Sequence, residues 1–406
     1  MKCGLLGEKL GHSYSPQIHK YLADYSYTLF EKQPDELQDF LCNGDFTGIN
    51  VTIPYKKSVI PFCDELSPVA QKLNSVNTIV RREDGTLIGH NTDYFGFQSM
   101  VHRSGLSVAN KKVLVLGSGG ASATAVAVLT EAGANVVVIS RSGENNYQNL
   151  HLHADATVIV NATPVGMYPN VGISPVDLCL FPNLEGILDI VYNPARTKLL
   201  LDAECRGLVC ENGLWMLVAQ AMESAEWFSG QKISDKKIAY IHEILKKQMQ
   251  NLILIGMPGS GKSTIGKLLA QKTGKQFVDA DTRIVEKSGK SIPAIFKEVG
   301  EEGFRKFESQ VLEELGIQSG LVIATGGGCV TVPENYHALH QNGKIYWIQR
   351  NIDLLPTEGR PLSQNSNLQS MYQVRAPLYE RFADEIVDNN GHPDETVHKI
   401  LSLEGM

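Results

Sequence analysis

The chain has 406 residues, of which 43% are hydrophobic and 20% are charged, and its formal net charge is −7. This length exceeds what one hydrophobic core usually supports, so we expect two or three domains. The acidic balance argues against nucleic acid or an acidic membrane surface as the main partner. No apolar run is long enough to cross a membrane, the N-terminus lacks a secretory segment, and the seven cysteines are scattered. These features predict a cytoplasmic protein with reduced thiols, and they leave the oligomeric state open.

Short apolar runs alternate with helical patterns along most of the chain. A first series of strand-like runs lies at 4–6, 27–30 and 48–53, and a second lies at 113–116, 136–140, 157–161 and 186–191. This alternation predicts mostly parallel sheets with helices on their faces. A helical segment then ends at Gly230, and another covers 235–250. We interpret its polar end, 246–250, as a short tether before a third α/β unit.

The second series opens with a glycine-rich turn, VLVLGSGGAS, at 113–122. Between a strand and a helix, such a turn lets a pyrophosphate approach the helix N-terminus, although a serine stands at the last glycine position of the usual pattern. The candidate cofactor-binding residues of this turn are Gly117, Gly119, Gly120 and Ala121. About twenty residues later the chain has Arg141 and no Asp or Glu, which favours NADP over NAD. The alternative is that Arg141 is a solvated surface charge.

A complete G-x-x-x-x-G-K-[ST] phosphate loop, GMPGSGKST, covers 256–264, between an apolar run and a helical pattern. Its glycines let backbone N–H groups face the β and γ phosphates, Lys262 supplies positive charge, and the Ser263 hydroxyl suits magnesium. The loop therefore predicts an ATP and Mg²⁺ site, whose other candidate residues are Gly259, Gly261 and Thr264.

Polar side chains gather in four short motifs before the glycine-rich turn: GHSYSP, NVTIPYK, SVNTI and NTDYFG. Each residue alone reads as a turn or capping residue. Together their hydroxyls, amides, ammonium and carboxylate are the groups needed to bind a small polyhydroxylated acid and to transfer a proton to a carbonyl.

These motifs, with GSGGAS, NATPVGM, DIVYNP and NGLWMLVAQA, resemble the ordered motif set of shikimate dehydrogenase over about residues 1–247. The resemblance implies reduction of 3-dehydroshikimate by NADPH, with Lys56 and Asp93 as the catalytic pair. It implies that the substrate is held by Ser13, Ser15, Thr52, Asn77, Asp93 and Gln220. It also implies that the nicotinamide end of the cofactor is flanked by Asn161, Thr163 and Met216.

The developing alkoxide needs a proton and a positive charge, and Lys56 can supply both. Lysine is normally protonated at neutral pH, and Asp93 favours that form. Either burial opposes Asp93, or Lys56 acts mainly through its charge while a water molecule carries the proton. The sequence leaves both routes open.

After the phosphate loop, the motifs D-x-D, FR-x-x-E, GGG, RPL and R-x-P-x-Y resemble shikimate kinase over about residues 250–390. The resemblance implies that Lys262 and Ser263 bind phosphates and magnesium and that Asp279 contacts the metal either directly or through one of its ligands. Asp281 would accept the proton of the substrate hydroxyl, and Arg360 would lie on a lid over the transferring phosphate. The residues implied to hold shikimate are Asp281, Arg305, Gly327, Gly328 and Arg375.

We therefore expect a bifunctional α/β enzyme that reduces 3-dehydroshikimate and then phosphorylates shikimate. The expected architecture is a substrate-binding α/β domain (1–103 and 226–249), a Rossmann NADP-binding domain (104–225) and a P-loop kinase domain (250–406) with a parallel sheet. One alternative is a quinate-type dehydrogenase joined to the kinase. Another is a metabolite-sensing regulator without catalysis, against which the retained reacting groups argue: Lys56, Asp93, Lys262, Ser263 and Asp281.

Overall fold

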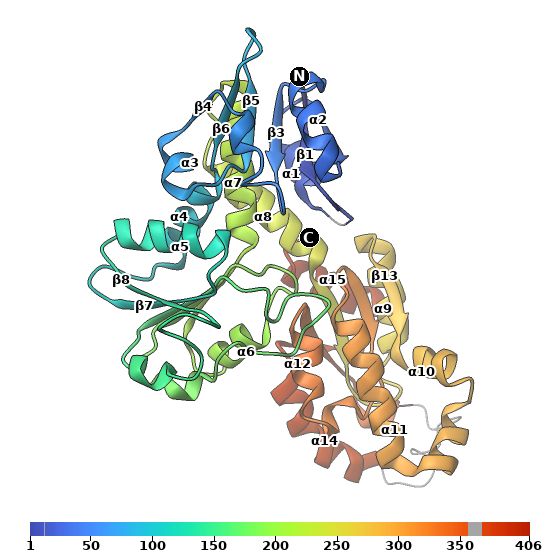
Figure 1. The fold of residues 1–406 in the computed structure, drawn as a ribbon. Helices are drawn as coiled ribbons and strands as arrows, with labels where there is room; N and C mark the ends of the chain where they lie inside the picture. Colours follow the sequence, from blue (N-terminus) through green and yellow to red (C-terminus); the bar gives the residue numbers. More distant parts are fainter. Residues whose placement is uncertain (12, 356–367) are drawn as a thin grey trace. The chain divides into compact units, whose positions relative to one another are not determined.

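The computed structural model describes residues 1–11, 13–355 and 368–406 (Figure 1). The chain divides by its contacts into two compact units. Unit 1 comprises Met1–Val165, Ser174–Tyr192 and Asp202–Ile244, and unit 2 comprises Gly166–Ile173, Asn193–Leu201 and Leu245–Met406. No helix among the described residues combines the length and apolar character needed to cross a membrane.

Two short segments of unit 2, Gly166–Ile173 and Asn193–Leu201, fall inside the range predicted for the NADP-binding domain. Within unit 2, the Arg196 guanidinium donates to the carbonyl oxygens of His340 (2.9 Å) and Gly343 (3.2 Å). Such side-chain bonds to backbone carbonyls cannot be read from the local sequence pattern. The exact boundaries between the three predicted domains stay a prediction.

The first sheet of unit 1 is six-stranded and mixed, with the order β2-β1-β3-β5-β6-β4. Its strands are β1 (Lys2–Gly7), β2 (Ser26–Glu31), β3 (Gly48–Val51), β4 (Glu65–Leu66), β5 (Thr78–Arg81) and β6 (Leu87–His90). The strands predicted in this part of the chain, β1, β2 and β3, pair in parallel, whereas β5 runs antiparallel to both β3 and β6. The reason is a tight turn between β5 and β6, in which Gly85 adopts a φ of 90°, a left-handed conformation that glycine adopts readily.

The helices around this sheet are α1 (Ser15–Leu22), α2 (Leu37–Asn43), α3 (Pro68–Leu73), α4 (Asp93–Ser104) and α7 (Leu214–Ser229). The predicted end of α7 is confirmed, because Gly230 takes the left-handed conformation that closes the helix. Helix α7 packs against α4, so residues far apart in the sequence meet beside the sheet.

The second sheet of unit 1 is entirely parallel, with the order β11-β10-β9-β7-β8. Its strands are β7 (Lys112–Leu116), β8 (Asn135–Ile139), β9 (Val158–Asn161), β10 (Gly186–Asp189) and β11 (Val209–Asn212), with helices α5 (Gly120–Glu131) and α6 (Lys198–Glu204) in the same stretch of chain. Strands β7 and β9 are almost completely buried. The glycine-rich turn joins β7 to α5, as the Rossmann expectation requires.

The predicted helix at 235–250 is confirmed, because α8 (Lys236–Met249) continues through the expected tether at 246–250 and β12 begins at Asn251. The ammonium of Lys275 donates to the carbonyl oxygens of Lys247 (2.7 Å), Gln248 (2.9 Å) and Gln250 (2.8 Å). A lysine that satisfies the last carbonyls of a helix keeps the helical form stable up to the next strand.

Unit 2 contains a five-stranded parallel sheet with the order β13-β14-β12-β15-β16. The strands are β12 (Asn251–Ile255), β13 (Gln276–Asp279), β14 (Leu321–Ala324), β15 (Gly343–Gln349) and β16 (Glu385–Asp388). The helices are α9 (Lys262–Thr273), α10 (Ala280–Ser288), α11 (Ile292–Gly316), α12 (Asn335–His340), α14 (Leu368–Phe382) and α15 (Pro393–Leu403). Since carboxyl ends of parallel strands share one edge, the segments after β12, β13 and β14 meet there.

Candidate active sites

The predicted pair Lys56 and Asp93 is brought together in unit 1. Lys56 follows β3 and Asp93 is the first residue of α4, and the Lys56 Nζ lies 2.5 Å from the Asp93 Oδ2. Their side chains are 28% and 18% exposed, so the pair is accessible to a small ligand. The Lys56 carbonyl accepts a bond from the Val76 N–H (2.8 Å), which fixes the backbone that carries the ammonium.

Two of the predicted substrate ligands, Asn77 and Gln220, meet through Thr92. The Asn77 Oδ1 accepts from the Thr92 N–H (2.7 Å), and the Thr92 hydroxyl donates to the Gln220 Oε1 (3.4 Å). Thr52 lies after β3 and its N–H donates to the Leu6 carbonyl (2.9 Å). The structure thus brings the start of β5, the start of α4 and the middle of α7 to one place.

The predicted serines lie at the start of α1, where the Ser13 hydroxyl accepts from the Ser15 N–H (3.2 Å). Burial raises the pKa of Tyr27 well above its usual value, opposed by a hydrogen bond with Ser15. Tyr27 donates in turn to the Asn50 Oδ1 (2.7 Å). The sequence reasoning gave no role to Tyr27, because a tyrosine in a strand carries no signal of its buried hydrogen bond.

A cavity of about 620 Å³ lies over the glycine-rich turn in unit 1. Predicted cofactor residues Gly117, Gly119, Arg141 and Thr163 line it. Gly117 has a φ of 105°, and a Cβ there would lie 3.0 Å from the Ala162 carbonyl oxygen, so only glycine suits this position. A Cβ at Gly119 or Gly120 would meet open space. That space at the helix start fits a pyrophosphate.

Two residues expected at the nicotinamide end are buried. The Asn161 side chain donates to the Asp189 Oδ1 (2.9 Å) and accepts from the Thr163 hydroxyl (2.6 Å). Met216 is packed in the hydrophobic core. These contacts show that Asn161 shapes the loop after β9, whereas its direct contact with a cofactor stays a prediction. Ala121 belongs to the first turn of α5. The sequence missed Tyr147, which lines the cavity beside Arg141.

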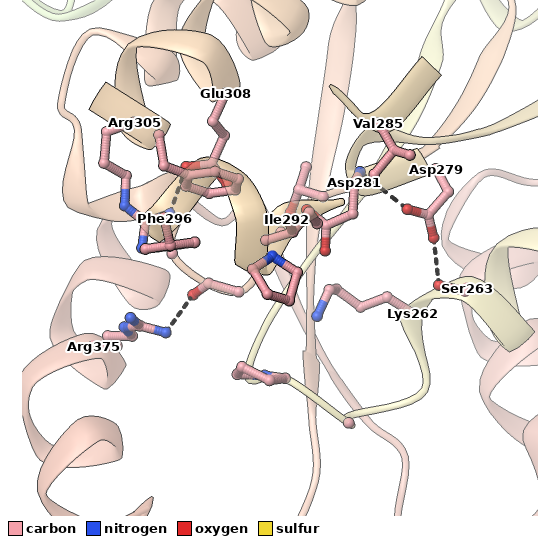
Figure 2. Close-up of a pocket in the computed structure, with 18 of the residues that line it drawn as sticks. Lys262, Ser263, Asp279, Asp281, Val285, Ile292, Phe296, Arg305, Glu308 and Arg375 are labelled. Atoms are coloured by element: carbon pink, nitrogen blue, oxygen red, sulfur yellow. Dashed lines mark hydrogen bonds and ion pairs between the residues drawn. The ribbon is translucent and has the colours of Figure 1, made fainter. Parts of the chain in front are cut away.

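A cavity of about 710 Å³ lies at the carboxyl edge of the unit 2 sheet. The predicted kinase residues that line it are Gly259, Gly261, Lys262, Ser263, Thr264, Asp279, Asp281, Arg305, Gly327, Gly328 and Arg375. Figure 2 shows Lys262, Asp281 and Arg375 around the same space. Arg360 and most of the expected lid lie outside the described residues.

The phosphate loop has the backbone shape that its glycines predict. Gly259 and Gly261 adopt φ values of 87° and 97°. The Lys262 Nζ donates to the carbonyl oxygens of Gly256 and Met257, both at 2.9 Å, so the ammonium lies over the loop. A positive charge at the start of α9, beside a loop with glycines at positive φ, fits the phosphates of a nucleotide.

The two predicted metal ligands are in contact, since the Ser263 hydroxyl donates to the Asp279 Oδ2 at 2.6 Å (Figure 2). The other Asp279 oxygen caps α10 by accepting from the N–H groups of Asp281 (3.1 Å) and Thr282 (3.3 Å). In the described part of the chain, no three His, Cys, Asp or Glu side chains form a metal-holding group. Two protein oxygens fit Mg²⁺, which keeps several waters and takes phosphate oxygens.

The opposite side of the cavity carries two arginines. Arg305 donates to the Glu308 Oε2 (2.6 Å) and to the Glu301 Oε1 (3.0 Å), and Arg375 donates to the Gly327 carbonyl (3.2 Å). A side chain at Gly328 would collide with the Arg305 guanidinium. Gly328 therefore lets the Arg305 guanidinium lie against the backbone.

Glu308 is completely buried, and burial raises its pKa while Arg305 opposes that rise. The sequence motif FR-x-x-E contains Glu308, but no role was predicted for it; its spacing of three from Arg305 on a helix was the available signal. Figure 2 shows further side chains that the sequence reasoning missed, the apolar Val285, Ile292 and Phe296.

Comparisons with known proteins identify a family for each of the two parts of the chain. Residues 5–79 match the family model "Shikimate dehydrogenase substrate binding domain", and residues 258–404 match "Shikimate kinase". The NADP(+) shikimate dehydrogenase of Clostridium perfringens is 36% identical over 266 residues, which cover 60% of this chain and 97% of the relative.

Two solved structures resemble the same part of the chain. Shikimate dehydrogenase 1 from Peptoclostridium difficile is 38% identical with a TM-score of 0.55, and the match covers 60% of this chain and 97% of that one. The Thermus thermophilus enzyme in complex with NADP(H) and shikimate is 29% identical with a TM-score of 0.55, covering 60% of this chain and 99% of that one. The chain belongs to the shikimate dehydrogenase family, carries a shikimate kinase domain after it, and is a bifunctional enzyme of the shikimate pathway.

Proposed function

We propose that unit 1 reduces 3-dehydroshikimate to shikimate with NADPH and that unit 2 phosphorylates shikimate with ATP and Mg²⁺. The observation that carries the proposal is that each unit holds the reacting groups of one step. Unit 1 holds the Lys56–Asp93 pair at 2.5 Å. Unit 2 holds the phosphate loop, Asp281 and both arginines around one cavity.

In unit 1, NADPH supplies the hydride. The Lys56 ammonium then stabilises the negative charge that develops on the carbonyl oxygen, and Asp93 holds the ammonium in position. The neutral amides and hydroxyls of Asn77, Gln220 and Ser15 are suited to the hydroxyl and carboxylate groups of the substrate.

The preference for NADP is supported by Arg141, which lines the same cavity as Gly117 and Gly119. Its guanidinium can bind a 2′-phosphate, whereas an NAD-binding turn would need an acidic residue for the ribose hydroxyl. The Clostridium perfringens relative is named as an NADP(+) enzyme. The Thermus thermophilus structure contains NADP(H).

In unit 2, ATP supplies the phosphoryl group and Mg²⁺ neutralises its charge. Lys262 holds phosphate oxygens, and Ser263 with Asp279 supplies the protein oxygens for the metal. Asp281 orients the attacking hydroxyl and accepts its proton. Arg305 and Arg375 bind the substrate carboxylate, since guanidinium groups favour a planar two-oxygen partner.

Two assays on the full chain test the proposal. NADPH oxidation should require 3-dehydroshikimate, and ADP release should require both shikimate and Mg²⁺, with loss of the second activity on chelation and recovery on adding Mg²⁺. Faster turnover of quinate with NAD would favour the quinate-type alternative. Ligand binding without turnover in either assay would favour the metabolite sensor.

A further inference from the structure

A buried polar network includes Thr92, the residue before Asp93. It consists of Asn50 on β3, Thr78 at the start of β5, Thr92 before α4 and Ser224 on α7, each at most 5% exposed. The Ser224 Oγ lies 2.7 Å from the Asn50 Nδ2 and 2.9 Å from the hydroxyls of Thr78 and Thr92. Ser224 is therefore the hub that joins the four elements.

The network fixes which way the Asn77 amide faces. A backbone N–H can only donate, so the Asn77 atom 2.7 Å from the Thr92 N–H must be the oxygen Oδ1. The hydroxyls of Thr78 (3.1 Å) and Thr92 (3.2 Å) also lie within bonding distance of this oxygen. With its acceptor sites occupied by the protein, Asn77 has only its Nδ2 hydrogens left for a ligand.

The direction of some of these bonds can be traced from Tyr27. Burial raises the pKa of Tyr27, so its hydroxyl keeps its proton and donates to the Asn50 Oδ1 at 2.7 Å. The Asn50 Nδ2 then donates to Ser224 (2.7 Å) and Thr78 (3.1 Å). Because Thr78 accepts there, its own hydrogen is available for an acceptor, and the Asn77 Oδ1 (3.1 Å) and the Ser224 Oγ (2.9 Å) both lie within reach.

We propose that Ser224 is a positioning residue which, with Thr78 and Thr92, fixes the Asn77 amide as a hydrogen-bond donor toward the substrate. The inference rests on the proposed role of Asn77 as a substrate ligand. Donor polarity selects an oxygen acceptor on the ligand, a hydroxyl or a carboxylate. In a buried network this polarity is expensive to reverse, because a reversed amide would face the Thr92 N–H with another donor.

Helix α7 offers a matched control for Ser224. The Ser224 Oγ lies 2.9 Å from the Gln220 carbonyl, and the Ser229 Oγ donates to the Ala225 carbonyl at 2.8 Å. Ser229, further along the same helix, thus makes the same bond to the carbonyl four residues before it, while the network contacts belong to Ser224. Comparing Ser224→Ala with Ser229→Ala separates the network from the loss of a helical serine.

The test is steady-state kinetics of the reductase in the full chain. Ser224→Ala should raise the KM for 3-dehydroshikimate by roughly five- to tenfold, the effect of one lost buried hydrogen bond. Its kcat should stay within about twofold and its KM for NADPH should not change, while Ser229→Ala should match the wild type. Thr78→Val removes the hydroxyl that donates to Asn77 and should raise the same KM, which provides a second variant if Ser224→Ala does not fold.

Asn77→Asp distinguishes the ligand role of Asn77 from the positioning role of Ser224. Its carboxylate still accepts from Thr92 but cannot donate to the ligand. It should raise the KM strongly, and adding Ser224→Ala to it should add little. An unchanged KM in Asn77→Asp would contradict the proposed ligand role of Asn77 itself. The inference about Ser224 is wrong if Asn77→Asp raises the KM but Ser224→Ala behaves like Ser229→Ala or changes kcat instead of KM. It is also wrong if Ser224→Ala raises the KM of Asn77→Asp by as much as it raises that of the wild type.

Discussion

Replacing Lys56 by methionine tests the reductase mechanism most directly. Methionine keeps an unbranched stem of similar length and removes the ammonium that lies 2.5 Å from Asp93. We expect kcat for reduction to fall steeply, because the oxygen that accepts negative charge loses its cationic partner. Phosphorylation should be unchanged, because its reacting groups belong to the core of unit 2.

The size of the expected fall in kcat follows from the role and the solvent exposure of Lys56. Loss of one oxyanion-stabilising donor costs about 10²–10³ in kcat, and loss of a general acid costs about 10²–10⁴. The Lys56 side chain is 28% exposed, so solvent screens part of its field and the upper limit does not apply. We expect a fall of about 10³-fold, equivalent to about 4 kcal/mol in the activation barrier.

The assay is NADPH oxidation at saturating 3-dehydroshikimate, with shikimate-dependent ADP release measured on the same preparation. Lys57→Met is the matched control, since Lys57 is the next residue and its side chain is exposed. It should leave both activities unchanged. A fall of less than about tenfold in Lys56→Met would refute the reasoning, and so would a parallel loss of kinase activity.

Three further predictions concern other groups. Lys262→Ala should remove kinase activity, seen as lost ADP release, and leave NADPH oxidation intact; loss of both activities in a folded variant would contradict it. Arg141→Ala should weaken NADPH binding by roughly 1.5–3 kcal/mol in a fluorescence titration and NADH binding far less, and equal losses would show that Arg141 does not read the 2′-phosphate. Burial and Glu226 raise the pKa of Glu223 to about 7, so its contribution to folding stability is full below about pH 4.5 and is lost as pH rises through 7. Urea unfolding should therefore show Glu223→Gln gaining up to about 3 kcal/mol on the wild type between pH 4.5 and 7.5, and an unchanged difference would refute this.

The parts of the fold that the sequence predicted are those in which a local pattern requires one backbone geometry. The phosphate loop needs glycines at positive φ, and Gly259 and Gly261 have it. The two-residue spacing of Asp279 and Asp281 required a chain turn, and Asp279 both ends β13 and caps α10. In these places local chemistry and tertiary structure agree, so a local sequence pattern is sufficient to predict the backbone geometry.

The parts that escaped prediction depend on partners far along the chain. Ser224 reads as an ordinary helical serine, and its hydrogen bonds reach Asn50, 174 residues away. Glu308 reads as a charged helical residue, yet it is completely buried against Arg305. Burial and pairing of this kind are fixed by which faces pack together, and a local pattern does not contain that information.

The two proposed sites handle the same acid with different charge arrangements, and the chemistry explains the difference. Hydride addition creates one negative charge on one oxygen, so a single cation held by one carboxylate, Lys56 with Asp93, is sufficient. Phosphoryl transfer spreads charge over several oxygens, and the acceptor also carries a carboxylate, so unit 2 gathers Lys262 for the phosphates and Arg305 and Arg375 for the acid around its cavity. Removing the Lys56 cation should therefore act mainly on kcat. In unit 2 no single group carries the whole charge, so the effect of removing a cation depends on which ligand that cation holds. Loss of Lys262 should affect the nucleotide, and loss of either arginine should affect the acid.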